Sequence, residues 1–64
     1  MTDKQIVEYL DKGFSRSVIN QTIDFLKQNN GELFNLAIID QNTFRIMWKD
    51  LKTKRVEAKL FPIL

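Results

Sequence analysis

Residues 18–39, VINQTIDFLKQNNGELFNLAII, decide the fold of this 64-residue chain. Up to Leu26 the apolar residues recur every three or four positions, which indicates one buried face of a helix. After Gly31 they recur every second position, which predicts a β-strand. The residues of this alternation are Phe34, Leu36 and Ile38, separated by Asn35 and Ala37. A helix therefore ends and a strand begins close to Gly31.

The segment before this point predicts a pair of helices. Thr2 and Gln5 form a capping-box pattern, so the first helix is expected at about residues 3–12, with Gly13 ending it in a left-handed conformation. Glu8 and Lys12 are spaced as an i,i+4 ion pair. The expected apolar face consists of Ile6, Val7, Leu10 and Phe14.

The second helix follows after a tight turn. Either Ser15 or Ser17 can cap its first turn, and the sequence Asn29-Asn30-Gly31 ends it, because Asn and Gly tolerate a positive φ. Its apolar stripe consists of Val18, Ile19, Thr22, Ile23, Phe25 and Leu26. The two helices are thus expected to form a hairpin.

Two further strands are predicted after the first. Turns are expected at residues 40–43 and 50–54, and Pro62 should end the last strand near Phe61. The apolar alternations are Phe44, Ile46 and Trp48, then Val56, Ala58 and Leu60. The prediction is an α+β fold in two layers, a two-helix hairpin followed by a three-stranded antiparallel β-meander, in one domain. The apolar face should pack on the helices, and the other face should be basic through Arg45, Lys49, Lys52, Lys54, Arg55 and Lys59.

Composition argues against several function classes. The chain has no Cys and no His, which removes disulfides, most zinc sites and the commonest general bases and nucleophiles. Its two glycines form no phosphate-binding loop. The acidic side chains of the first helix alternate with lysines, as on a solvated surface. We therefore expect no enzyme activity, no metal and no cofactor.

Location and assembly can also be anticipated from the sequence. The first residues lack the basic and then apolar pattern of a signal peptide, and no apolar run approaches the ~20 residues that span a bilayer. A cytoplasmic protein is expected. Abundant Lys, Asn, Ile and Phe suggest A/T-rich codons, as in a firmicute or a phage. The core of so short a chain contributes only about 3–5 kcal/mol to the free energy of unfolding. Formation of a homodimer is therefore a further possible source of stability.

Residues 5–26, QIVEYLDKGFSRSVINQTIDFL, resemble the helix-turn-helix of bacterial and phage transcription regulators. The resemblance implies a DNA-binding protein whose second helix enters the major groove. The residues at its base-contacting positions are Arg16, Ser17, Asn20 and Gln21. The later basic hairpin resembles the wing of a winged-helix protein, with Lys49, Lys52, Lys54 and Arg55 available for phosphates. Residues 33–64 carry six cations against three acids, which suits an acidic partner.

A different reading is a protein-interaction module, such as a phage-type inhibitor or accessory subunit, that binds an acidic or apolar protein surface. Its contact residues would be an outward Met47 and an apolar tail, Phe61, Ile63 and Leu64. The tail could instead fold onto the core, or serve self-association together with a free sheet edge. Gly13-Phe14-Ser15 also resembles the first loop of ubiquitin-associated domains, a likeness that would require a third helix over residues 32–39.

Overall fold

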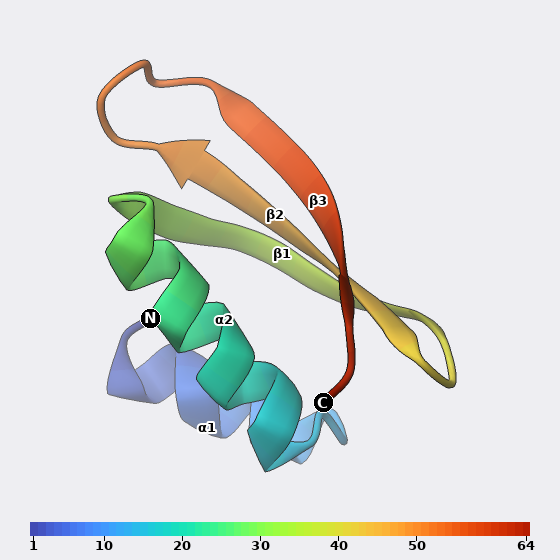
Figure 1. Cartoon of the computed structure of the whole chain (residues 1–64). Coiled ribbons are helices and arrows are strands. Elements are labelled where there is room, and N and C mark those ends of the chain that lie inside the picture. Colours follow the sequence, from blue (N-terminus) through green and yellow to red (C-terminus); the bar gives the residue numbers. More distant parts are fainter.

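The computed structural model describes residues 1–64 and shows two helices followed by a three-stranded antiparallel sheet (Figure 1). The elements are α1 (Asp3–Asp11), α2 (Arg16–Gln28), β1 (Gly31–Asp40), β2 (Thr43–Asp50) and β3 (Val56–Pro62). Strand order is β1-β2-β3, so β2 is the central strand. The predicted α+β arrangement is confirmed. Neither helix is long and apolar enough to cross a membrane.

The helix ends follow from local hydrogen bonding. In the predicted capping box, the Gln5 amide donates to Thr2 Oγ1 at 3.2 Å and the Thr2 amide donates to Gln5 Oε1 at 3.0 Å. Gly13 has a φ of 94°, the left-handed conformation expected of it. Of the two candidate caps for α2, Ser15 is the one used, since its hydroxyl accepts from the Val18 amide at 3.2 Å.

The buried face of α1 differs from the prediction at one position. Val7 is 56% exposed, whereas Tyr9 is buried and meets the Phe14 ring edge-on at a centroid distance of 5.1 Å. The reason is that α1 packs on α2 rather than on the sheet, so only a narrow stripe of its surface is covered. Val7 lies outside this stripe, whereas Tyr9 belongs to the buried core.

The core lies between α2 and the central strand. Phe44, Ile46 and Trp48 point inward from β2 and are buried, as the alternation predicted. The helix side of this core consists of Val18, Ile19, Thr22 and Leu26. The buried Thr22 hydroxyl is satisfied because it donates to the Val18 carbonyl at 2.8 Å.

The predicted inward face of β1 is wrong at Phe34. Leu33 lies opposite Trp48 and Asn35 lies opposite Met47, so Phe34 is an extra residue in a β-bulge. The bulge turns Leu33 and Leu36 into the core and leaves Phe34 62% exposed. The third helix that a ubiquitin-associated domain would need is replaced here by β1, so that likeness fails.

The predicted face of β3 is also wrong. Ala58 pairs with Met47 and Leu60 pairs with Arg45, so both lie on the side of the sheet away from the helices. Val56 lies on the same side, and all three are exposed. Glu57 and Lys59 occupy the helix side, but no helix covers that part of β3, and both are solvated.

The backbone of Gly31 sits against the core in a way that only glycine allows. A Cβ atom there would lie 2.7 Å from Trp48 Cδ1 and 3.3 Å from Leu26 Cδ2. Since Trp48 is buried, its ring has little room to retreat.

We expect Gly31→Ala to lower the free energy of unfolding by about 1–3 kcal/mol, because overpacking forces the core to shift. Urea unfolding followed by Trp48 fluorescence measures this. Lys27→Ala, on the exposed face of α2, is the control and should change stability by less than about 0.5 kcal/mol. Equal stability of the two variants would contradict the close approach at Gly31.

Candidate functional site

The side of the sheet that faces away from the helices is the most distinctive surface of the molecule. We call this surface the open face. Strand pairing and burial place on it Phe34, Ala37, Arg45, Met47, Lys49, Val56, Ala58 and Leu60. Apolar side chains therefore outnumber cations on it. Of the six cations predicted to form a basic face, only Arg45 and Lys49 lie here, so the prediction is wrong for the other four.

Arg45 stands at the centre of the open face. It lies on β2 between Ala37 of β1 and Leu60 of β3. Its Nε atom is buried and has no hydrogen-bond partner. A buried donor without an acceptor costs about 1–3 kcal/mol. The open face thus contains a guanidinium whose Nε–H has no acceptor within the chain.

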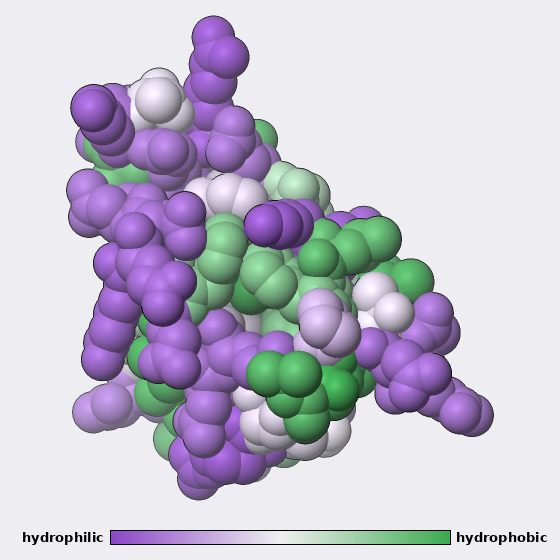
Figure 2. Space-filling model, in the orientation of Figure 1, coloured by the Kyte–Doolittle hydropathy of each residue, from purple (hydrophilic) through white to green (hydrophobic).

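The other predicted cations are divided between two places. Lys52, Lys54 and Arg55 lie in the β2–β3 turn, from which hydrophilic side chains project in Figure 2. This turn is organised by Asp50, whose Oδ1 accepts from the amides of Lys52 at 2.8 Å and Thr53 at 3.1 Å. Lys59 is on the helix side of β3, with its Nζ 5.5 Å from the centroid of the Phe61 ring.

The first turns of α2 carry the residues that the helix-turn-helix resemblance assigned to DNA. Arg16 and Asn20 are exposed there, one helical turn apart. Ser17 and Gln21 instead bind the end of the chain. The Gln21 Nε2 donates to the Pro62 carbonyl at 2.9 Å, and Gln21 Oε1 accepts from the Leu64 amide at 3.1 Å. The Ser17 hydroxyl donates to the Leu64 main-chain oxygen at 2.8 Å.

These two groups of predicted DNA contacts lie at opposite ends of α2. The Leu51 amide donates to the Asn30 carbonyl at 3.2 Å, which holds the β2–β3 turn beside the C-terminal end of the helix. Arg16 is at the N-terminal end, and a 13-residue helix is about 20 Å long. The structure therefore brings Arg16 and Asn20 together, but not with Lys52, Lys54 and Arg55.

The apolar tail folds back onto the core, which was one of its two expected positions. The Phe61 ring lies 4.8 Å from that of Phe25 and 5.5 Å from that of Phe44, measured between centroids. Ile63 is partly buried against the same core, and its amide donates to the Asn42 carbonyl at 2.8 Å. Of the residues predicted to meet a partner, Leu64 is the most exposed, at 84%.

The surface has no pocket that could enclose a small molecule, and no three acidic side chains converge as metal ligands would. Comparison with family models, curated proteins and solved structures finds no match to this chain. The open face is accordingly the candidate functional site, and four of its apolar residues were missed because the sequence placed them in the core: Phe34, Val56, Ala58 and Leu60.

We expect Gln21→Ala to release the tail from α2, because it removes one donor and one acceptor that bind the main chain of residues 62 and 64. The loss should lower the free energy of unfolding by about 1 kcal/mol and speed hydrogen exchange at the Leu64 amide. Asn20→Ala is the matched control, since Asn20 is exposed and next in sequence. A Gln21→Ala variant with unchanged amide exchange at Leu64 would rule out this clamp.

Proposed function

We propose that this protein is a protein-interaction module and that its open face is the binding surface. The partner would be a protein that presents apolar side chains around a carboxylate. The observation that supports this most directly is Arg45, a cation whose buried Nε has no acceptor within the chain, at the centre of an apolar surface.

The apolar content of the open face supports the proposal. Phe34 on β1 is 62% exposed, and Leu60 on β3 is 57% exposed. The two residues lie on opposite sides of the open face, because β1 and β3 flank β2. Met47 lies between them, with Asn35 on one side and Ala58 on the other. Contiguous exposed apolar side chains are uncommon on monomers and typically mark interaction sites. Met suits such a site, because its side chain adapts to the shape of a partner.

The charges of the open face favour an acidic partner. Arg45 and Lys49 lie on the central strand. Two acids share this side of the sheet: Glu32 pairs with Lys49, and Asp40 pairs with Thr43 at the β1–β2 turn, where its Oδ1 accepts from the Asn42 amide at 2.8 Å. No carboxylate faces Arg45, whose strand neighbours are Ala37 and Leu60. A guanidinium prefers a carboxylate as its bidentate acceptor, and such a bond strengthens when a binding partner excludes water.

The test begins by capturing partners from a lysate of the host with the protein immobilised, with and without nuclease treatment. The captured protein is then purified and titrated against variants. We expect Arg45→Met to weaken binding about tenfold or more, because it keeps the apolar stem but removes a charged hydrogen-bond donor. Arg55→Met is the matched control, as Arg55 lies in the β2–β3 turn, and should bind nearly as the original chain does.

A second pair of variants tests the apolar part of the surface. Phe34→Ser should weaken binding, whereas Val7→Ser, which alters a comparably exposed apolar residue on α1, should not. If both pairs of variants bind alike, or if nuclease abolishes capture, the open face is not the binding surface.

DNA binding is a second candidate, favoured by the exposure of Arg16 and Asn20 on successive turns at the start of α2. An Arg there can contact guanine or phosphate, and an Asn can pair with adenine. Ser17 and Gln21, which the resemblance places beside them, are bound to the tail, so a DNA contact would rest on the other two.

If DNA is the ligand, Arg16→Ala and Asn20→Ala should each weaken binding by about 1–3 kcal/mol in fluorescence anisotropy, and binding should fall steeply as salt rises. Lys4→Ala, on the exposed surface of α1, is the control. No binding to duplex DNA at low salt and micromolar protein would exclude this candidate.

A further inference from the structure

The free edge of β3 carries backbone groups that no part of the chain satisfies. At one end of the β2–β3 pair the Asp50 amide donates to the Arg55 carbonyl at 2.8 Å, and at the other the Ile63 amide donates to the Asn42 carbonyl at 2.8 Å. Hydrogen-bonded and non-bonded pairs alternate in an antiparallel ladder. The odd-numbered residues of β3 therefore bond to β2. Val56, Ala58 and Leu60 direct their amide and carbonyl groups outward.

The rest of this edge is already occupied. Beyond Leu60, Gln21 binds the outward-facing groups of Pro62 and Leu64, as described above. Before Val56, the chain leaves the strand through Lys54, which has a φ of 65° and donates its amide to the Asp50 carbonyl at 2.7 Å. A short, regular stretch of three outward-facing residues remains open.

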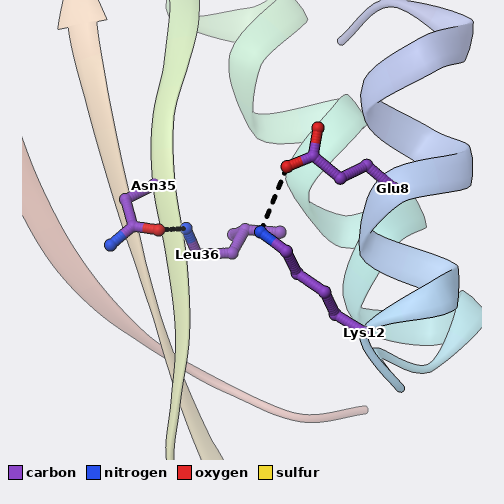
Figure 3. A network of polar contacts seen from close by, with 4 residues as sticks. All are labelled: Glu8, Lys12, Asn35 and Leu36. Atoms are coloured by element: carbon purple, nitrogen blue, oxygen red, sulfur yellow. Dashed lines mark hydrogen bonds and ion pairs between the residues drawn. The ribbon is translucent and has the colours of Figure 1, made fainter.

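The opposite edge, on β1, is protected. It is interrupted by the bulge at Leu33–Asn35, and bulges hinder pairing with another strand. The Asn35 side chain also folds onto its own strand, where Oδ1 accepts from the Leu36 amide at 2.9 Å (Figure 3). Strand addition is therefore directed to β3.

We propose that β3 pairs antiparallel with β3 of a second copy of this chain, about a two-fold axis at Ala58. The alternation of side chains and of backbone groups selects this arrangement. Val56 would lie opposite Leu60 of the partner subunit, and the two Ala58 residues would face each other. These are the residues with outward backbone groups, so the three pairs would form about six hydrogen bonds, two for each pair.

The charges of β3 are complementary to themselves in this register. On the helix side, Glu57 would lie opposite Lys59 of the partner subunit, and the symmetry repeats the contact. Both side chains are exposed, because the helices do not cover β3. A shift of the axis to Glu57 or to Lys59 would place like charges opposite each other, which is unfavourable. Charge therefore favours the axis at Ala58 over both neighbouring registers.

This dimer does not require the partner of the proposed function. The two sheets would join into one of six strands, and the open faces of both copies would become continuous across Val56, Ala58 and Leu60. A symmetric, isologous contact of this kind closes on itself and does not propagate into a fibre.

Sedimentation equilibrium of the purified chain, from micromolar to millimolar concentration, tests the proposal. The average mass should rise from that of one chain to that of two. Lys59→Glu and Glu57→Lys each place like charges opposite each other twice, so each should weaken the dimer about tenfold or more. The double variant with both changes restores opposite charges and should recover the dimer. Glu32→Lys, the same charge change on β1, is the matched control.

Hydrogen exchange gives an independent readout. The amides of Val56, Ala58 and Leu60 should become protected as the concentration rises, while the Leu36 amide should not change. Three results would overturn the proposal. The chain could stay monomeric at all concentrations, both single charge reversals could leave the dimer affinity unchanged, or the double variant could dimerise as weakly as the single variants. None of these results depends on the protein or DNA ligand discussed above.

Discussion

The burial of one face of β2 under α2 constrains the whole surface of this protein. β2 is hydrogen-bonded on both sides, and Phe44 and Ile46 are completely buried. Their inward direction forces Arg45 and Met47 outward, because side chains alternate along a strand. Cross-strand pairing then determines the sides of β1 and β3, so that Ala58 and Leu60 must also face away from the helices. The composition of the open face is thus a result of the packing on its other side.

The packing of α2 on β2 also explains how far the fold could be predicted. The helices, the central strand and both turns were predictable. The reason is that α2 and β2 each bury one face, and the spacing of their apolar residues indicates which face is buried. The alternation on β3 predicted that Val56, Ala58 and Leu60 face the helices, which is wrong. No helix covers Glu57 and Lys59 on the other side, so β3 is solvated on both faces and its sequence does not indicate a buried face. The bulge at Phe34 was visible only as two leucines, Leu33 and Leu36, spaced three apart within an alternating strand.

The candidate site was less accessible to prediction than the fold. The outward position of Met47 followed from its inward neighbours on β2. The use of Ser17 and Gln21 by the tail did not, because these bonds join residues that are 47, 43 and 41 positions apart. A polar residue at the start of a helix has the same sequence pattern whether it binds DNA, solvent or its own chain. Spatial neighbours that are distant in sequence decide between these roles.

The Gln21 bonds to the tail have a consequence for the order in which the structure assembles. Most other packing contacts join elements adjacent in sequence, namely α1 with α2, α2 with β1, β1 with β2, and β2 with β3, and the packing of α2 on β2 skips only one strand. Such short-range contacts close small loops and form quickly, whereas the entropy lost on closing a loop grows with its length. We infer that folding proceeds by successive addition of neighbouring elements, and that attachment of residues 62–64 to α2 completes it.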